Sequence, residues 1–499
     1  MPRRPTPPPP PLRRLLPPGL DLDAHLAAHP PPFHPFRRDA LVHLLYQLLA
    51  IPAADRKLAA RLDARRGFVP LSTARLQRWL RNYPAYLAYC LQSGLLETDH
   101  HHVTGLKCRW YRFAPPYRHA TPAGGPGEVV ELHEPALLRA LARQRRQPPG
   151  ITAAQRARFD HLLRWLDPAR CPLRVDTAAA LEGLRLRYEQ RLLTPEPKPA
   201  PLGRAASPPR YKNALRQYQS AVSSLLQLAE LNLHPGFDAQ GRLYSALTNA
   251  GKDLRPYLTA PGYGALVCLD LSSSQPYLLN LLLQPACYLS PTEAAAGQLT
   301  LAGQGGAPYR RLLQLDPAAT DDVRALLPGG GSLPPDVVRF RAWTSSGTFY
   351  QHLRRALAES VPERTLPPGE AGFKRLVLAL LYSRPGLGRA DSWRAPYKRA
   401  FARLLPTVYL VTETFKRRDL ALLPCLMQAF EAYLLLDVVA GRVGRELPRA
   451  PLFSIHDALV TTEEYADAVE AVLREELRRA TGLEPGVKRK VWSPPPRGG

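Results

Sequence analysis

The chain has 499 residues, of which 45% are apolar, so it exceeds a single small domain and is typical of a globular protein with two to four domains. Lys and Arg number 67 against 42 Asp and Glu, giving a formal net charge of +25. Such an excess of positive charge favours a nucleic acid as partner, although a basic bias of the whole proteome would produce the same number.

The cysteines and the apolar stretches bear on the cellular compartment. Six cysteines, with no CxxC pair among them, argue against a disulfide scaffold or a zinc ribbon and for a reducing compartment. No uncharged apolar run reaches the roughly 18–20 residues that span a bilayer. The most apolar stretch, residues 422–441, carries Gln428, Glu431 and Asp437, and is interpreted as a buried helix. We therefore expect a cytoplasmic monomer without a membrane partner.

Three segments precede the region where chemistry is expected. Residues 1–32 are rich in Pro and Arg and predict a disordered tail. Residues 33–120 predict three helices followed by two short strands, a pattern that resembles a winged helix, a variant of the helix-turn-helix DNA binders. A packing module without nucleic-acid contacts would have the same pattern. Residues 121–235 are interpreted as a mostly helical linker region.

A first candidate carboxylate follows a buried strand. The apolar residues 265–269 predict that strand, and Asp270 lies at its end. A carboxylate placed there is held by a rigid sheet yet faces a cleft, as ligation of a divalent metal requires. Taken alone, Asp270 could equally cap a helix or a turn.

A second carboxylate lies in a predicted hairpin. Residues 452–455 and 459–462 predict two strands, with His456 and Asp457 in the tight turn between them. Two Mg²⁺ ions about 3.5–4 Å apart need carboxylates from separate strands, and Asp457 could supply the second one. Without Asp270, the His-Asp pair would be a weak signal.

A cation and an aromatic residue share a predicted helix between these two carboxylates. In the segment FKRLVLALLYS, Lys374 and Arg375 precede Tyr382, and Arg375 and Tyr382, seven residues apart, fall on nearly one face. A cation near one end could hold an incoming triphosphate while the aromatic ring packs beside the base or sugar. A buried helix with a charged first turn is the structural alternative.

In their order and spacing, these three elements resemble motifs A, B and C of the superfamily that joins family A DNA polymerases and the single-subunit RNA polymerases of phages and mitochondria. The helix follows the pattern KR-x-V-x-x-L-x-Y associated with the RNA polymerases. Upstream, FDAQGRLYS resembles their D-x-x-G-R-x-Y element and supplies Arg242 and Tyr244. The resemblance covers about residues 235–470.

Four positions depart from this superfamily's usual pattern. The Arg that usually precedes the motif B Lys by four residues is Glu370, and the Gly that commonly follows the motif B Tyr is Ser383. The Glu that blocks the 2′-hydroxyl in DNA polymerases is Gln275. The motif C turn reads His-Asp-Ala rather than His-Asp-Glu or His-Asp-Ser, which indicates a divergent branch.

The resemblance implies an α+β right-hand fold, with palm, fingers and thumb built mostly of helices around a small antiparallel palm sheet. Residues 121–235 would then contribute the thumb, and residues 236–499 the palm and fingers. Two Mg²⁺ ions would be held by Asp270 and Asp457. The partners implied are a DNA template, nucleoside triphosphates and the nucleic-acid product.

The same resemblance implies a role for each candidate residue. Lys374, assisted by Arg375, would contact the triphosphate, Tyr382 would lie at the nascent base pair, and His456 would orient the 3′ end. Contacts with sugar, template, primer or product are expected from the remaining candidates, namely Arg242, Tyr244, Gln275 and Gln428, although Gln428 could equally be a buried, satisfied amide.

The leading hypothesis is a compact DNA-directed RNA polymerase of a phage or mobile element. A DNA polymerase or primase on the same palm is the runner-up. A third hypothesis is a non-catalytic winged-helix DNA-binding protein whose palm has decayed; it would require the loss of Asp270 or Asp457, and both are present.

Overall fold

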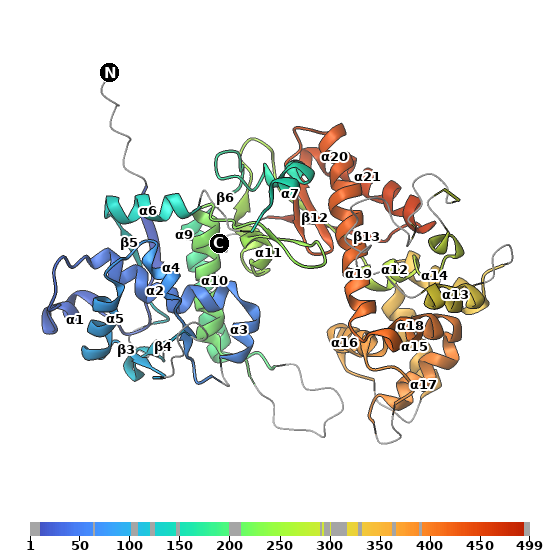
Figure 1. Cartoon of the computed structure of the whole chain (residues 1–499), viewed down its shortest axis with the longest axis horizontal. Helices are drawn as coiled ribbons and strands as arrows, with labels where there is room; N and C mark the ends of the chain where they lie inside the picture. Colours follow the sequence, from blue (N-terminus) through green and yellow to red (C-terminus); the bar gives the residue numbers. More distant parts are fainter. Residues whose placement is uncertain are drawn as a thin grey trace.

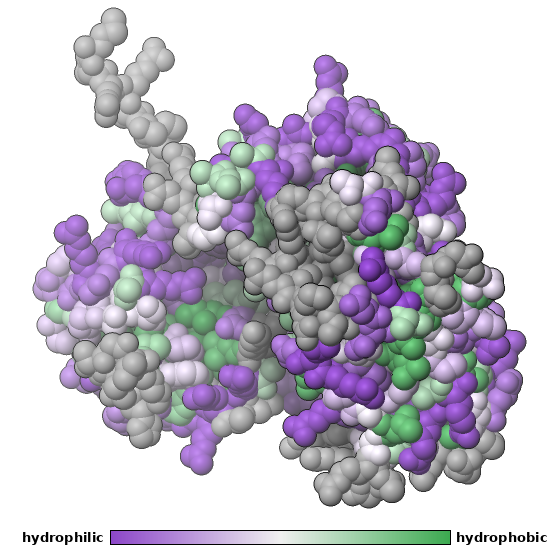
Figure 2. Space-filling model, turned by 45° about the vertical axis from the view of Figure 1, so that its right-hand side comes forward, coloured by the Kyte–Doolittle hydropathy of each residue, from purple (hydrophilic) through white to green (hydrophobic). Residues whose placement is uncertain are grey.

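The structure is a computed structural model of the whole chain. It describes residues 10–62, 65–100, 108–119, 125–145, 150–198, 211–289, 292–293, 300, 317–327, 332–361, 366–388 and 392–493. Within these ranges the protein is mostly helical, with small antiparallel sheets, and therefore belongs to the α+β class. Figure 1 shows the N-terminal elements on one side and helices α13 to α18 on the other, joined by the elements around β12 and α11. Figure 2 shows the surface recessed between these two sides.

The predicted disordered tail is wrong for residues 10–32. Strand β1 (Leu12–Leu15) pairs antiparallel with β5 (Val129–Leu132), and helix α1 (Leu22–Ala28) follows it. Arg14 is buried and forms an ion pair with Glu230, while its Nε donates to Nδ1 of His43 over 2.8 Å. Buried Leu12, Leu15 and Leu16, together with the ion pair of Arg14, stabilise a segment that its composition alone would leave unfolded.

The elements predicted for residues 33–120 are present. They comprise a three-stranded antiparallel sheet in the order β2-β4-β3 and helices that pack beside it. The chain order is α2 (Arg38–Ala54), α3 (Arg56–Arg61), β2 (Val69–Pro70), α4 (Thr73–Gln77), α5 (Tyr83–Gln92), β3 (Leu96–Thr98) and β4 (Trp110–Phe113). Gly94, with φ of 76°, follows the end of α5. The centre of the predicted wing lies outside the described residues.

Helix α5 is uncharged, although it holds the place of a recognition helix in the winged-helix pattern. Its exposed positions are Pro84, Ala88 and Gln92, whereas the nearby basic side chains Arg78 and Arg81 precede it. The DNA-binding role of this segment therefore stays a prediction, and α5 itself brings no positive charge to it.

The expected boundary at residue 120 runs through a shared core. Helix α10 (Ala214–Ala229) packs against α2 on one side and against α9 (Thr177–Leu193) on the other. The β1–β5 pairing joins the N-terminal residues 12–15 to residues 129–132, beyond the expected boundary. The remaining elements here are η1 (Pro115–Tyr117), α6 (Pro135–Arg145), α7 (Ala153–Arg158), α8 (Asp160–Leu163) and β6 (Arg174–Val175).

A four-stranded antiparallel sheet in the order β11-β12-β10-β13 organises the C-terminal half. Its strands are β10 (Leu266–Leu271), β11 (Phe453–Ile455), β12 (Ala458–Thr462) and β13 (Val487–Trp492), which confirms the three strands predicted around Asp270 and Asp457. Helix α21 (Glu463–Thr481) packs on one face of this sheet. The opposite face is therefore left for the site (Figure 1).

Smaller elements surround this sheet. Between β6 and the sheet lie β7 (Gly236–Phe237), β8 (Leu243–Tyr244), α11 (Ala246–Asn249), η2 (Arg255–Tyr257) and β9 (Leu258–Thr259). After β10 come α12 (Ser274–Leu279), η3 (Pro285–Tyr288), α13 (Pro317–Leu326), α14 (Pro335–Ser345), α15 (Phe349–Ser360), α16 (Gly369–Tyr382), α17 (Ala395–Leu404) and α18 (Pro406–Arg418). Helix α16 confirms the helix predicted to carry Lys374 and Tyr382.

One continuous helical stretch connects these helices to the sheet. It consists of α19 (Leu422–Ala432), a π-helical segment η5 (Tyr433–Val439) and α20 (Ala440–Glu446). By length and hydropathy alone this stretch could cross a membrane, but 67% of its most apolar window is buried inside the protein. Its apolar side chains pack against α12, α18 and α21, so the folded core accounts for its hydropathy.

Candidate active site

The two predicted metal ligands lie side by side on neighbouring strands. Asp270 on β10 is opposite Ala458 of β12, and Asp457 immediately precedes Ala458 in the hairpin turn. The backbone N–H of Leu271 donates to the carbonyl of Asp457 over 3.2 Å, which fixes the two segments at the ends of their strands. Both side chains are half-buried and come from rigid sheet positions, as the sequence indicated.

Left-handed backbone conformations adjoin both carboxylates. His456 has φ of 55° in the two-residue turn, and Ser273 has φ of 52° between β10 and α12. Residues other than glycine rarely adopt this region; each costs on the order of 1–3 kcal/mol and persists only where the surrounding structure enforces it. Such strain is typical of a functional site.

Electrostatics couple the two carboxylates. Burial raises the pKa of Asp270 above its ordinary value, and the neighbouring charge of Asp457 raises it further. The cations Lys374, Lys488 and Arg255 partly oppose this shift of the Asp270 pKa. A pair of close carboxylates with incomplete compensation attracts a multivalent cation.

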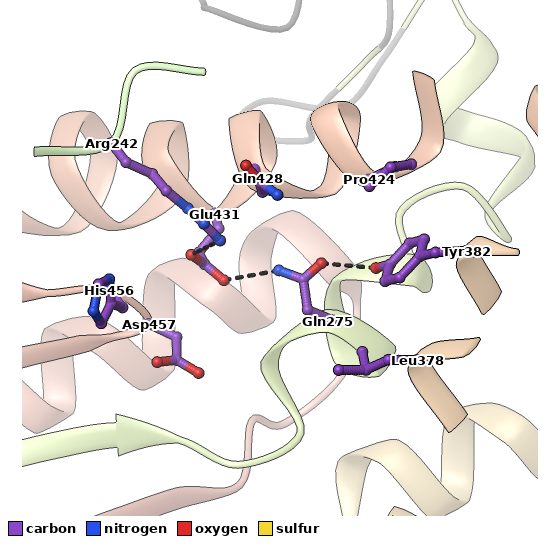
Figure 3. Close-up of a pocket in the computed structure, with 9 residues that line it drawn as sticks. All are labelled: Arg242, Gln275, Leu378, Tyr382, Pro424, Gln428, Glu431, His456 and Asp457. Carbon is purple, nitrogen blue, oxygen red and sulfur yellow. Dashed lines mark hydrogen bonds and ion pairs between the residues drawn. The ribbon is translucent and has the colours of Figure 1, made fainter. Parts of the chain in front are cut away.

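Beside Asp457 a pocket of about 280 Å³ contains most of the predicted nucleotide contacts. Figure 3 shows the side chains that surround it. They are Arg242, Gln275, Leu378, Tyr382, Pro424, Gln428, Glu431, His456 and Asp457. Residues widely separated in the sequence therefore converge on one cavity.

A chain of hydrogen bonds crosses this pocket (Figure 3). The Tyr382 hydroxyl donates to Oε1 of Gln275 over 2.7 Å, and Nε2 of Gln275 donates to Glu431 over 3.0 Å. Arg242 donates to the other oxygen of Glu431 over 2.6 Å, and the Ser274 hydroxyl adds a third bond of 2.8 Å. Every polar end of the Gln275 amide is thus oriented by a neighbour.

Glu431 is the central residue of this network and was not among the predicted site residues. The Glu431 side chain is 3% exposed, and this burial is the main cause of its raised pKa. The charge of Asp457 also raises the pKa, whereas the charge of Arg242 and the hydrogen bonds from Ser274 and Gln275 lower it. The sequence signal was a carboxylate within an apolar helix, three residues after Gln428. A buried charge needs a partner, and here that partner is Arg242.

The hairpin of β7 and β8 delivers Arg242 and Tyr244. The Asp238 carboxylate accepts from the backbone N–H groups of Gln240 and Arg242, and Gly241 has φ of 85° in the turn. Tyr244 then meets His456 edge to face, with ring centroids 5.9 Å apart. The D-x-x-G-R-x-Y pattern therefore has a local structural cause.

Helix α16 presents side chains both to the pocket and to Asp270. Leu378 and Tyr382 line the pocket, and Lys374 continues the same i, i+4 stripe towards Asp270. The Lys374 Nζ lies 5.9 Å from the ring centroid of Tyr350, a residue of α15 that the sequence did not single out. Arg375 is half-buried on α16 and is not among the residues that line the pocket, so its contact with a triphosphate stays a prediction.

Gln428 is not a buried, satisfied amide. It lies on α19, half-buried in the pocket wall, and it makes no hydrogen bond within the described part of the chain. Its amide is available to a ligand.

Comparisons with known proteins leave the chain without an assigned family. No protein family and no curated protein matches its sequence. A similar solved structure is the POL domain of Pol1 from M. smegmatis, in complex with DNA primer-template and dNTP. The similarity has 16% sequence identity and a TM-score of 0.28, and covers 71% of this chain and 72% of that one. At this TM-score the resemblance carries no weight, and the chain's own residues carry the functional argument.

Proposed function

We propose that the chain is a template-directed nucleotidyltransferase, a DNA-directed RNA polymerase of phage or mobile-element type. The observation that carries this proposal is the placement of Asp270 on β10 beside Asp457 in the β11–β12 turn, next to a pocket walled by Tyr382, Gln275 and Gln428. In this proposal the four-stranded sheet is the palm, helices α14 to α18 are the fingers, and residues 121–235 contribute the thumb.

The donor set fits Mg²⁺. Among the described residues no group of three or more His, Cys, Asp or Glu could hold a metal, so the protein offers the two carboxylates. Mg²⁺ is commonly bound by one or two carboxylates together with water and substrate phosphates. The raised pKa of Asp270 indicates a site that a cation would relieve. Two such ions, when bound, activate the attacking hydroxyl and neutralise the leaving oxygens.

The chain's own residues position the reactants. Lys374 is exposed and bound to no described carboxylate, so its ammonium group is available to a triphosphate near Asp270. His456, packed against Tyr244, would orient the 3′ end of the growing strand beside Asp457. Gln428 would donate to a base or sugar oxygen of primer or template from the opposite wall.

Sugar selection follows from the direction of the hydrogen bonds. Because the Tyr382 hydroxyl donates to Gln275, the Tyr382 oxygen keeps lone pairs that can accept from a ribose 2′-hydroxyl. The Gln275 amide also keeps one of its two protons after bonding Glu431. We propose that both groups favour ribonucleotides.

A DNA polymerase on the same palm is the second candidate. The observation that favours it is the fixation of Gln275 from both ends, because a side chain that cannot rotate away is an effective steric block to a 2′-hydroxyl. Primer extension on a DNA template with Mg²⁺ and separate ribo- and deoxyribonucleotide pools distinguishes the two candidates. Extension with ribonucleotides supports the first, extension restricted to deoxyribonucleotides supports the second, and absence of both refutes a polymerase.

A further inference from the structure

The last strand of the sheet presents lysines on the same face as Asp270. In the antiparallel register, Lys488 is directly opposite Asp270 and Lys490 is directly opposite Cys268. Directly opposed residues of an antiparallel pair point to the same side of the sheet. The intervening Arg489 points to the other side, where it forms an ion pair with Asp467 of α21. Strand β13 therefore separates its cations between two faces.

Arg255 adds a third cation to this face. Its guanidinium lies 5.4 Å from the ring centroid of Trp492, which is opposite Leu266 in the same register. The charges of Arg255 and Lys490 both lower the pKa of Cys268, although burial keeps that pKa raised to about 11. The Nε of Arg255 is buried and has no hydrogen-bond partner in the described part of the chain. We call Arg255, Lys488 and Lys490 the β13 cation group.

This group forms no ion pair in the described part of the protein, although the charges of Lys488 and Arg255 act on Asp270. Lys488 and Lys490 are exposed, and neither forms an ion pair with a described carboxylate. The only described acid directly opposite either lysine is Asp270, which is already assigned to the metal site. The three cations form no ion pairs, and they lie beside the two carboxylates that would bind metal ions. Such a group is suited to an anionic ligand that also binds the metal.

The β13 cation group lies away from the nucleoside pocket. The pocket is lined by residues from α12, α16, α19 and the β7–β8 and β11–β12 hairpins, and includes none of these three cations. In the sheet order, β13 flanks β10 on the side opposite that hairpin. Lys374 acts on Asp270 as Lys488 does, but from helix α16. With Arg255 of η2, cations therefore act on Asp270 from three separate elements.

We propose that the β13 cation group binds the β- and γ-phosphates of the incoming nucleoside triphosphate and the pyrophosphate that leaves. This inference rests on the proposed function. Lys488 and Lys490 are two residues apart, about 6.8 Å along a strand, a span that the outer oxygens of a diphosphate can bridge.

The group acts on the leaving side of the reaction. When the 3′-oxygen bonds to the α-phosphorus, the bond from that phosphorus to the α–β bridging oxygen breaks, and pyrophosphate leaves with the electron pair. The hydroxyl proton passes to water. Cations that face the β-phosphate stabilise the charge that builds up there.

Calorimetric titration of the full chain with inorganic pyrophosphate in Mg²⁺ tests this site directly. Lys488→Ala with Lys490→Ala should weaken pyrophosphate binding at least tenfold, and Lys488→Arg should retain most of it. Arg489→Ala, on the same strand but facing α21, is the matched control and should bind within twofold of wild type. Circular dichroism establishes that each variant is folded.

A parallel measurement of primer–template affinity distinguishes the two sources of phosphate. The double variant should bind primer–template within twofold of wild type. If primer–template affinity falls while pyrophosphate binding is kept, the strand contacts nucleic-acid backbone and the proposal is wrong. The titration measures binding and needs no catalytic turnover. If the double variant loses pyrophosphate binding, the site is supported even when the wild-type protein extends no primer. If the wild-type protein extends primers and the double variant binds pyrophosphate as well as wild type, the pyrophosphate site is refuted while the proposed polymerase function stands.

Discussion

Replacing Tyr382 by Phe removes a single hydroxyl from the pocket and keeps the ring that packs there. That hydroxyl donates to Gln275 over 2.7 Å, and its oxygen would accept from a ribose 2′-hydroxyl. A neutral hydrogen bond contributes a net ~1 kcal/mol, which corresponds to roughly a fivefold change in a rate ratio. We therefore expect the ratio of kcat/KM for ribo- over deoxyribonucleotides to fall about fivefold.

The loss should fall on ribonucleotides, because a deoxyribose has no 2′-hydroxyl to contact Tyr382. Single-nucleotide incorporation with each pool measures the two values of kcat/KM separately. Tyr350→Phe is a matched control, since Tyr350 lies near Lys374 but does not line the pocket, and its sugar preference should equal that of wild type. A strong deoxyribonucleotide preference in wild type, unchanged by Tyr382→Phe, would refute this reasoning and promote the DNA polymerase.

Three further predictions concern the network, the carboxylate pair and the N-terminal segment. Glu431→Ala leaves the half-buried Arg242 without its carboxylate partner. Because the Arg242 side chain is 20% exposed, we expect the free energy of unfolding to fall by ~3 kcal/mol, the lower end of the usual range. Urea unfolding, monitored by hydrogen exchange of α19, measures this loss, and a loss below about 0.5 kcal/mol would contradict the network. Folding raises the pKa of Asp270. The contribution of Asp270 to the free energy of unfolding is therefore fully present below its pKa in the unfolded chain and is lost as the pH rises through its pKa in the folded protein. Asp270→Asn removes the buried charge and should therefore stabilise the metal-free protein at neutral pH. Mg²⁺ at a hundred times its Kd should stabilise wild type by ~2.7 kcal/mol and this variant much less, as thermal melts with and without Mg²⁺ would show. Deleting residues 33–120 should yield an aggregating chain on size-exclusion chromatography, because α10 loses the core it shares with α2; a folded monomer would restore the predicted boundary.

The sequence predicted the parts of the site that have strong local patterns. Apolar residues before Asp270 and on either side of His456 and Asp457 indicated the three strands, because short buried strands between turn signals leave few alternatives. The helix of Lys374 and Tyr382 followed from its apolar spacing. In each of these elements the neighbouring residues suffice to determine the structure.

Non-local pairings were beyond the sequence patterns. Strand β13 lies beside β10 although more than two hundred residues separate them, and nothing in VKRKVW indicates which of its lysines faces Asp270. Strand β1 folds because distant β5 and Glu230 provide partners, which its Pro- and Arg-rich composition does not reveal. Glu431 was noticed only as a charge in an apolar helix, because its role depends on Arg242 from another hairpin.

Primer extension by Asp270→Ala and Asp457→Ala tests the central claim most directly. Each variant should lose polymerisation while binding primer–template nearly as well as wild type, because the carboxylates stabilise charge in the transition state and phosphate contacts elsewhere provide affinity. Asp467→Ala, an exposed carboxylate on α21, is the control and should extend normally. Retention of more than about a tenth of wild-type activity by either site variant, a loss of only ~1.4 kcal/mol, would contradict the assignment.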